Sequence, residues 1–477
     1  MLTPTELAGH LSGRAIIRKN LPIRDIQHDS RSCTPGSAYF AFPGLHHDGC
    51  SFIEDAINRG ASLIVSPQAA DADPRADHII LESGQIRQAY ALASSLFYGN
   101  PSADTAVVGV TGTDGKTSTS YFLYQLLNGL GFISALSTTV LVDDGRGLIR
   151  SPFRNTTPEA WDVQGMIRRS VESGCEGFVL EASSHALSTD YSRLLGTSFR
   201  LAIFTRITSE HLDFHKSWDA YAQSKLNLAR MCSGPVVAYR DSPLLESLSR
   251  TVPSRLVVID RPEITGTDRE GLTFRYGHAH YRLPFPYPFA LENAFAAAAA
   301  AALITGNDMD VVLERLRDLS NPPGRQEVLC IAGRTAVIDF AHTPDAISRL
   351  LSSFRSLYPD SRFITVFGAS GERDRTKRPL MGRAASDESS LIVLTEDDSR
   401  DEDTQDICRQ IAAGITGADH LIITGRMAAV REAARVSRPG DVIFLLGIGV
   451  QDTLTRHGKA EKWDERAAIT AALEDLS

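Results

Sequence analysis

The chain has 477 residues, a length typical of about three domains. Its hydrophobic content of 43% is enough for sizeable cores, and its charged content of 22% is ordinary for a soluble globular protein. The net charge of −9 gives no sign of a basic surface that would neutralise phosphates, so no nucleic-acid partner is expected.

Neither disulfide bonds nor a membrane segment is predicted. The N-terminal residues lack a basic stretch followed by an apolar one, so no signal peptide is expected. No run approaches the length of about 18 apolar residues that a membrane span needs. The cysteines form no Cys-x-x-Cys pair, which favours reduced thiols over a disulfide framework or zinc site. They are Cys33, Cys50, Cys175, Cys232, Cys330 and Cys408. We expect a soluble, cytoplasmic monomer.

The first region, residues 1–102, is predicted to be a short α/β domain. It ends at Gly99–Ser102, where Gly-Asn-Pro-Ser forms a turn-rich break. Two apolar runs and two helical patterns alternate before it: Ala38–Phe42, Phe52–Arg59, Ser62–Val65 and Ile86–Phe97.

The second region, residues 103–323, opens on a strand, a glycine-rich turn and a helix. The strand-forming run is Thr105–Val110, and the helix-length segment is Thr117–Leu130. An alanine-rich helix is predicted at Glu292–Ile304, and the prolines of Asn321–Gly324 close the region.

The third region, residues 324–477, alternates apolar runs with helical stretches. This alternation predicts a mainly parallel sheet, in which ligands bind beyond the carboxyl ends of the strands. Polar residues or glycines follow each run, as such a site requires. The runs are Ala336–Phe340, Phe363–Phe367, Leu391–Thr395, Leu421–Thr424 and Val442–Leu446.

The sharpest local signal is Gly109–Thr117, with the sequence GVTGTDGKT. Its glycines let backbone N–H groups surround phosphate oxygens at a helix N-terminus. Lys116 can then reach the β and γ phosphates of a nucleotide, and the Thr117 hydroxyl can bind Mg²⁺. The strict P-loop spacing would need glycine where Val110 stands, so the loop is a variant. A tight turn without ligand is the alternative, which the combination of strand, Gly-Lys-Thr and helix disfavours.

This loop resembles the GT-x-GKT signature of the Mur ligases and the folylpolyglutamate synthases, with Asp114 in place of the usual Asn. Arg206 and Glu210 likewise stand where the family has Asn and Asp. Three further segments resemble the Mur ligase motifs E-x-S-S-H, FTN-x-x-x-DHLD-x-H and Y-x-x-x-K. They are Glu181–His185, Phe204–His215 and Tyr221–Lys225.

The resemblance implies that ATP phosphorylates a carboxylate and that an amine attacks the acyl phosphate. It implies Lys116, His211 and Lys225 as catalytic residues, with Lys225 carbamylated. Two Mg²⁺ ions would be held by Thr117, Glu181, His211 and Lys225, because divalent cations offset crowded phosphate charge. Taken singly, Glu181 could be a surface charge, His211 a core histidine and Lys225 a solvated lysine. Their order and spacing behind one loop disfavour these alternatives.

The resemblance extends to the walls of the nucleotide site. Pro323–Glu327, Asp339–Asp345 and Gly371–Pro379 resemble the family's PGR-x-E, DYAHTPD and GGDRD-x-x-KRP motifs. The ATP contacts implied in this way are Gly112, Thr113, Asp114, Gly115, Lys116, Thr117, Ser118, Asn293, Arg325, His342, Asp374, Arg375, Lys377 and Arg378.

Within the family, the first region resembles the uridine-binding domain of the branch that adds the third peptide residue. The matching segments are Asp29–Arg31, Pro35–Ala41 and Gly44–Gly49, together with Asn155–Pro158. Folylpolyglutamate synthases lack such a domain. The branch implies three α/β domains: uridine-binding, P-loop ATPase with a mainly parallel sheet, and Rossmann-like. Contacts with a UDP-MurNAc-dipeptide are implied for Ser30, His46, Asn155, Thr156, Thr157, Ser184, Arg193 and Lys225.

The acceptor amino acid is left open by two altered motifs. Asp397–Arg400 is DDSR where diaminopimelate enzymes have DNPR, and Gly447–Gln451 is GIGVQ where they have GKGHE. Arg400 can hold a carboxylate bidentately, which favours meso-diaminopimelate; lysine and ornithine remain alternatives. Acceptor contacts are implied for Asp397, Asp398, Arg400, Gly447 and Gln451. A folylpolyglutamate synthase-like ligase and a non-catalytic nucleotide-binding or precursor-binding protein are the rival functions.

Overall fold

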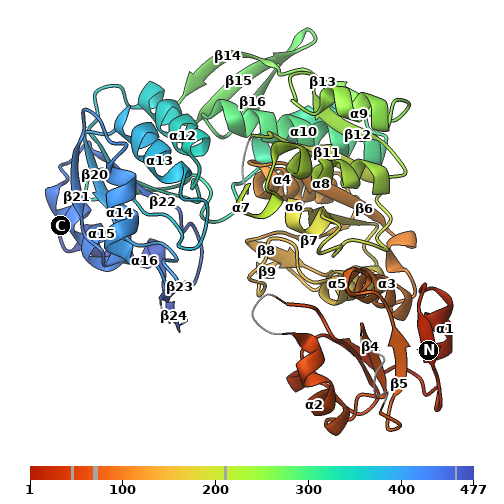
Figure 1. The fold of residues 1–477 in the computed structure, drawn as a ribbon. Helices are drawn as coiled ribbons and strands as arrows, with labels where there is room; N and C mark the ends of the chain where they lie inside the picture. The colour runs from red at the N-terminus through yellow and green to blue at the C-terminus, as the bar shows by residue number, and fades with distance from the viewer. Residues whose placement is uncertain (45–47, 68–72, 209–211, 457–458, 477) are drawn as a thin grey trace. The chain divides into compact units, whose positions relative to one another are not determined.

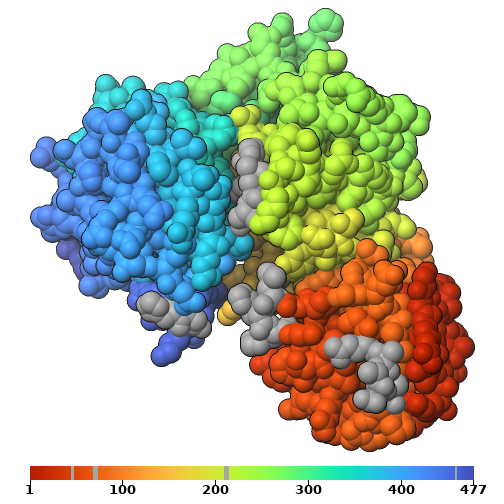
Figure 2. Space-filling view, in the orientation of Figure 1, coloured from red at the N-terminus to blue at the C-terminus, as the bar shows by residue number. Residues whose placement is uncertain are grey.

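The computed structural model describes residues 1–477 except 45–47, 68–72, 209–211, 457–458 and 477 (Figure 1). The chain is mixed α/β with mostly parallel sheets, as predicted. It divides into two compact units. Unit 1 comprises residues 1–207, 219–260 and 299–306; unit 2 comprises residues 208–218, 261–298 and 307–477. Figure 2 shows both in space-filling form, coloured along the chain. The predicted boundaries at residues 102 and 323 stay predictions.

The first sheet of unit 1 lies in the N-terminal region and has the order β1-β5-β4-β3-β2. Strands β2 to β5 pair in parallel, and β1 closes the edge antiparallel to β5. Helix α3 packs its buried face, including Tyr90, against the core around Ile26 and Phe40. The elements are α1 (Pro4–Gly9), β1 (Arg14–Ile16), β2 (Asp25–Gln27), β3 (Ser37–Phe40), α2 (Ile53–Asn58), β4 (Leu63–Ser66), β5 (Asp77–Ile80) and α3 (Ile86–Phe97).

The second sheet of unit 1 has the order β13-β12-β11-β6-β10-β7-β8-β9. Strands β13 to β7 in this order are parallel, so their carboxyl ends share one edge. The strands are β6 (Ala106–Thr111), β7 (Ser134–Ser137), β8 (Leu141–Asp143), β9 (Ile149–Arg150), β10 (Gly177–Glu181), β11 (Leu201–Phe204), β12 (Val236–Tyr239) and β13 (Leu256–Ile259). The helices are α4 (Lys116–Gly129), α5 (Ala160–Glu172), α6 (Ser184–Leu187), α8 (Trp218–Met231) and α9 (Leu245–Thr251).

Unit 2 is built around a sheet of order β17-β18-β22-β19-β20-β21, parallel except for the edge strand β17. Its strands are β17 (Glu327–Ile331), β18 (Arg334–Asp339), β19 (Phe363–Phe367), β20 (Leu391–Leu394), β21 (Asp419–Ile422) and β22 (Val442–Leu446). Unit 2 also contains two smaller antiparallel sheets. One consists of β14 (Glu263–Asp268), β15 (Gly271–Tyr276) and β16 (Ala279–Leu283). The other is the hairpin of β23 (Thr453–Arg456) and β24 (Lys459–Lys462). The helices are α7 (Leu212–His215), α11 (Met309–Glu314), α12 (Pro344–Leu357), α13 (Lys377–Ser386), α14 (Thr404–Ala412), α15 (Arg426–Val436) and α16 (Glu465–Glu474).

Helix α10 (Pro288–Thr305) contains the alanine-rich run. By length and composition it is apolar enough to cross a membrane, and 56% of this window is buried inside the protein. The core helix of a soluble protein has the same properties. The expectation of no membrane segment stays a prediction.

Candidate active site

The phosphate loop joins β6 to α4 at the carboxyl edge of the central sheet. The two residues that follow β11 hold it from one side: the Thr113 N–H donates to the Arg206 carbonyl at 2.7 Å, and the Thr205 hydroxyl donates to the Asp114 carbonyl at 2.7 Å. A Cβ on Gly112 would lie 1.8 Å from the Thr205 hydroxyl, so only glycine allows this approach. Arg206 supports the loop through its backbone, which any residue type supplies.

Helix α8 holds the same loop from a second side. Tyr221 and Lys225 lie one turn apart; the Tyr221 hydroxyl is 2.7 Å from the Thr113 hydroxyl, and the Lys225 ammonium donates to the Gly112 carbonyl at 2.6 Å. Lys225 is 1% exposed. The predicted Y-x-x-x-K pair therefore belongs to the phosphate-loop site. Carbamylation of Lys225 stays a prediction.

Lys116 and Thr117 begin helix α4, with Gly115 as its N-cap. The Lys116 ammonium donates to the carbonyls of Gly112 and Thr113, at 3.1 and 2.7 Å. Thr117 is 6% exposed, and Ser118 is 7% exposed. The positive charge and the start of the helix therefore meet at one loop, which is the electrostatic arrangement that favours phosphate.

Glu181 ends β10, the strand next to β6, and its carboxylate is fully buried. The carboxylate accepts two neutral hydrogen bonds, from the Thr139 N–H at 3.2 Å and the Thr139 hydroxyl at 2.9 Å. Within the described part of the chain, no cationic side chain contacts it. Buried carboxylates are normally paired or bound to metal. A Mg²⁺ ion held by one carboxylate, a hydroxyl and phosphate oxygens fits this donor set.

Two of the predicted contacts, His46 and His211, lie outside the described residues, as does Glu210. The described residues contain no group of three or more His, Cys, Asp or Glu side chains arranged to hold a metal. The predicted metal ligands in the described part are thus Thr117, Glu181 and Lys225.

The predicted dipeptide contacts converge partly on the same edge. Thr157 is fully buried, its hydroxyl donates to the Glu181 carbonyl at 2.7 Å, and its carbonyl accepts from Arg193 at 3.1 Å. Ser184 begins α6 directly after β10 and is 3% exposed. Ser30 is 4% exposed in the N-terminal region. Asn155 and Thr156 precede Thr157 in a loop.

Sequence reasoning missed Arg87 in the N-terminal region. Its guanidinium lies 4.3 Å from the Phe42 ring centroid and 4.8 Å from that of Tyr191, so it links the N-terminal region to the central one. Burial lowers the pKa of Arg87. Nearby, Arg193 forms an ion pair with Glu159 at 2.6 Å. Arg87 belongs to no motif, and its position at the start of the amphipathic helix α3 is the one signal in the sequence that could have indicated it.

In unit 2, several predicted ATP contacts gather around β18 and α13. The Lys377 ammonium donates to the His342 carbonyl at 3.0 Å, and Arg325 stacks over Phe340 at 4.4 Å. Asp374 accepts hydrogen bonds from the N–H and hydroxyl of Thr376. Asn293 lies on α10.

Arg378, in the first turn of α13, has a fully buried side chain. Its guanidinium donates to Glu402 at 2.9 Å, to the Gln410 side chain at 2.8 Å and to the Ser370 carbonyl at 3.2 Å. Arg375 adds a longer contact to Glu402, at 3.3 Å. Arg378 thus fastens the loop that follows β19 to α14, and its contact with ATP stays a prediction.

The Arg378–Glu402 pair predicts a pH dependence of stability. Hydrogen bonds from Arg378 lower the pKa of Glu402 from 4.5 to about 2. Since the folded pKa is depressed, the contribution is present above pH 4.5 and is lost as the pH falls towards 2. Urea unfolding from pH 5 to pH 3 should show a steeper loss of stability in the wild type than in Glu402→Gln. Equal slopes would contradict this account.

The two altered acceptor motifs meet at the carboxyl edge of the sheet in unit 2. Asp397 follows β20, is 4% exposed and accepts a hydrogen bond from Ser370 at 3.3 Å. Gly447 follows β22 with φ +98°, and a Cβ there would lie 2.7 Å from an Asp397 carboxylate oxygen. The glycine therefore lets the two segments approach each other.

The other predicted acceptor residues differ in how they are held. The Asp398 carboxylate accepts from the Thr455 N–H at 2.7 Å, and Arg400 adopts a left-handed φ of +53°. The Arg400 side chain is 33% exposed, and its guanidinium lies 3.8 Å from the Glu372 carboxylate. The side-chain oxygen of Gln451 is buried and accepts no hydrogen bond from the described residues. The Arg400 side chain is thus partly accessible, whereas the Asp398 carboxylate is already hydrogen-bonded to Thr455 of the hairpin.

Curated relatives match almost the whole chain. The UDP-N-acetylmuramyl-tripeptide synthetase of Roseiflexus sp. (strain RS-1) is 36% identical over 492 residues, covering 96% of each chain. The UDP-N-acetylmuramoyl-L-alanyl-D-glutamate–2,6-diaminopimelate ligase of Chlorobium phaeobacteroides is 35% identical, covering 96% of this chain and 93% of the relative. The MurF ligase of Thermotoga maritima, solved with ADP, has a TM-score of 0.66 at 17% identity, covering 96% of this chain and 100% of that one.

Three family models match successive parts of the chain. Residues 22–98 match the Mur ligase family catalytic domain, residues 110–301 the Mur ligase middle domain, and residues 324–449 the Mur ligase glutamate ligase domain. Together with relatives above 30% identity over nearly the full length, they show that the chain belongs to the Mur ligase family.

Proposed function

We propose that this Mur ligase adds a diamino acid to UDP-MurNAc-L-Ala-D-Glu in an ATP-dependent reaction. The observation that carries the proposal is the phosphate loop with Lys116 at its helix start, beside the buried Glu181 carboxylate. The names of the relatives, which are tripeptide synthetases and diaminopimelate ligases, support the choice of substrate.

The reaction divides into two steps. The D-glutamate carboxylate attacks the γ phosphate of ATP, releasing ADP and forming an acyl phosphate. The amine of the diamino acid then attacks the acyl carbon, and phosphate leaves as the amide forms. Lys116 and the N–H groups of the phosphate loop stabilise the charge on the transferred phosphate. Lys225 and Tyr221 keep that loop in position.

Thr117, Glu181 and Lys225 would hold Mg²⁺, which neutralises phosphate charge when bound. Carbamylation would turn Lys225 from a donor to the Gly112 carbonyl into a further carboxylate ligand. His211 completes the proposed set.

The proposed substrate contacts fall in two groups. Ser30 and His46 would bind the UDP part, and residues 155–157 with Ser184, Arg193 and Lys225 would bind the muramoyl dipeptide. Arg193 is held by Thr157 and Glu159, so its orientation is fixed. The product would feed peptidoglycan synthesis in the cytoplasm, and so cell-wall biogenesis, cell shape and cell division. We propose a monomer with no membrane or nucleic-acid partner.

For the acceptor we favour meso-diaminopimelate, with lysine and ornithine as alternatives. Diaminopimelate carries a second carboxylate that lysine and ornithine lack. Arg400, 33% exposed, is a suitable partner for that group. Neutral Gln451 gives less help to a distal ammonium than glutamate would.

Phosphate release tests the reaction and the acceptor together. With ATP and UDP-MurNAc-L-Ala-D-Glu, release should require an amino acid and be fastest with meso-diaminopimelate. Arg400→Met should lower kcat/KM for meso-diaminopimelate about 100-fold by removing a charge-assisted bidentate contact, and leave any lysine activity unchanged. Arg409→Met, which removes an exposed arginine from α14, is the control.

Other outcomes separate the alternatives. Release that is fastest with lysine or ornithine would overturn the preferred acceptor. Release with folate in place of the UDP-linked dipeptide would indicate a folylpolyglutamate synthase-like ligase. Nucleotide binding without release from any combination would indicate a non-catalytic binding protein.

A further inference from the structure

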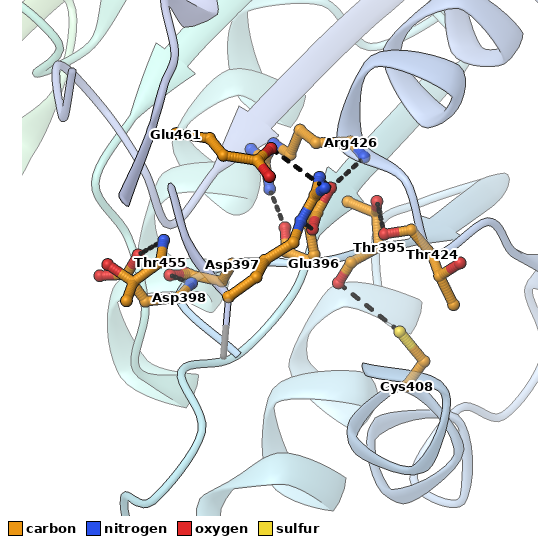
Figure 3. Close-up of polar contacts among 10 residues, drawn as sticks. Thr395, Glu396, Asp397, Asp398, Cys408, Thr424, Arg426, Thr455 and Glu461 are labelled. Carbon is orange, nitrogen blue, oxygen red and sulfur yellow. Dashed lines mark hydrogen bonds and ion pairs between the residues drawn. The ribbon is translucent and has the colours of Figure 1, made fainter. Parts of the chain in front are cut away.

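The β23–β24 hairpin is bound directly to the acceptor loop at residues 397–400. The Thr455 N–H donates to the Asp398 carboxylate at 2.7 Å, and the Arg400 N–H donates to the Thr455 carbonyl at 3.1 Å. Arg400 and Arg456 form an isolated parallel bridge. The loop after β20 thus gains an extra strand-like partner, and Figure 3 shows Thr455 beside Asp398.

Arg456, the next residue of the hairpin, contacts Glu396, which directly precedes this loop. Arg456 donates two hydrogen bonds to the Glu396 carboxylate, through Nε and through Nη2, the latter at 2.5 Å. The Glu396 side chain is 2% exposed, whereas the Arg456 side chain is 39% exposed. Arg456 also contacts Glu461 on β24, at 3.2 Å. The guanidinium therefore connects both hairpin strands to the start of the acceptor loop.

A second arginine, Arg426, connects Glu396 to the end of β22, directly before the other predicted acceptor segment at Gly447–Gln451. It is fully buried; its N–H donates to the Glu396 carboxylate at 2.7 Å and its guanidinium to the Glu396 carbonyl at 3.2 Å (Figure 3). It also donates to the Leu446 carbonyl at 3.0 Å, directly before Gly447. Glu465 balances its charge, at 2.5 Å. The contacts of Arg426 therefore connect the residues that precede both predicted acceptor segments, residues 397–400 and 447–451.

We propose that Arg456 is a positioning residue for the acceptor amino acid, which acts by holding Glu396 and the loop that carries Arg400. This inference rests on the proposed function, because it assigns the loop at 397–400 to acceptor binding. The contacts of Arg456 described above lie within unit 2, whereas those of the phosphate loop lie within unit 1. Arg456 therefore affects the amine step and leaves acyl phosphate formation unchanged.

The left-handed backbone of Arg400 explains why such a tie is needed. At φ +53° a non-glycine residue is strained, and it keeps this conformation only when its neighbours fix it. The hydrogen bond to Thr455 and the Arg456–Glu396 pair supply two such fixed points on either side of Asp398. Without them, the Arg400 side chain loses its fixed direction.

The test is Arg456→Met in the full-length protein, with Arg456→Lys as the conservative variant. Arg456→Met should raise KM for the acceptor about tenfold, with KM for ATP and for UDP-MurNAc-L-Ala-D-Glu within about twofold of wild type. Arg456→Lys should recover part of this loss, because it keeps the charge but not the bidentate geometry. Arg435→Met, which breaks the exposed pair with Glu432, is the matched control and should change none of the three constants.

Isotope exchange between ADP and ATP, measured with the dipeptide substrate and no amine, should be equal in wild type and Arg456→Met. An unchanged acceptor KM would overturn the proposal. Equal changes in all three KM values and in the exchange would overturn it too, since they would mark a general structural defect. A wild type that shows no exchange and no phosphate release contradicts the proposed function instead.

Discussion

Lys116→Ala is expected to abolish turnover, lowering kcat by about 10³-fold or more. Lys116 is the cation at the N-terminus of α4, and its ammonium contacts the carbonyls of the phosphate loop. Removing it takes away a positive charge from the place where the transferred phosphate gains negative charge. The measurement is steady-state phosphate release with saturating substrates.

The control for this variant is Lys19→Ala. Lys19 also donates from its ammonium to a backbone carbonyl, that of Arg75 at 2.7 Å, so the change removes the same kind of hydrogen bond from the N-terminal region. It should keep wild-type activity. Equal thermal stability of the two variants would show that the loss in Lys116→Ala is chemical. Wild-type-like activity of Lys116→Ala would contradict its assigned role.

Glu181→Gln is expected to lower kcat at least about 100-fold and to remove the response to divalent cations. The Glu181 carboxylate is fully buried and receives only neutral hydrogen bonds from Thr139. An amide of the same shape keeps much of this hydrogen bonding but has no charge for a cation. Without metal, the variant should be at least as stable as wild type, because it no longer buries an unpaired charge.

Thermal unfolding with and without Mn²⁺ gives a readout independent of activity. The wild-type Tm should rise with Mn²⁺, and the Glu181→Gln Tm should not, since a ligand stabilises only the form that binds it. Asp143→Asn is the matched control: Asp143 ends β8 of the same sheet, is also mostly buried, and accepts a hydrogen bond from the Tyr124 hydroxyl on α4 at 2.7 Å. A Mn²⁺ response retained in Glu181→Gln would rule out the proposed ligand.

Local sequence patterns predicted the bounds of several helices and strands closely. The helix predicted at Ile86–Phe97 is confirmed as α3, and the one predicted at Thr117–Leu130 differs from α4 by one residue at each end. Periodicity and glycine placement are local properties, which a single sequence contains. The strand predicted at Leu421–Thr424 was placed two residues late, because β21 pairs Asp419 with Leu391 at a partly exposed sheet edge.

Contacts between distant residues could not be predicted in the same way. The motif Y-x-x-x-K identified Lys225, but its hydrogen bond to Gly112, 113 residues away, depends on the packing of α8 against the loop. The motif at Gly371–Pro379 identified Arg378, but not its full burial against Glu402, which lies 24 residues further along the chain. The β23–β24 hairpin was not predicted, because its polar residues give no apolar alternation to follow.

The mass of the product is the most direct test of the proposed reaction. The protein is incubated with ATP, Mg²⁺, UDP-MurNAc-L-Ala-D-Glu and meso-diaminopimelate, and the UDP-linked species are separated and weighed by mass spectrometry. The account predicts one new species, heavier than the substrate by one diaminopimelate less one water, formed in equal amount to ADP. ADP release with an unchanged UDP-linked species, or no ADP release at all, would contradict it.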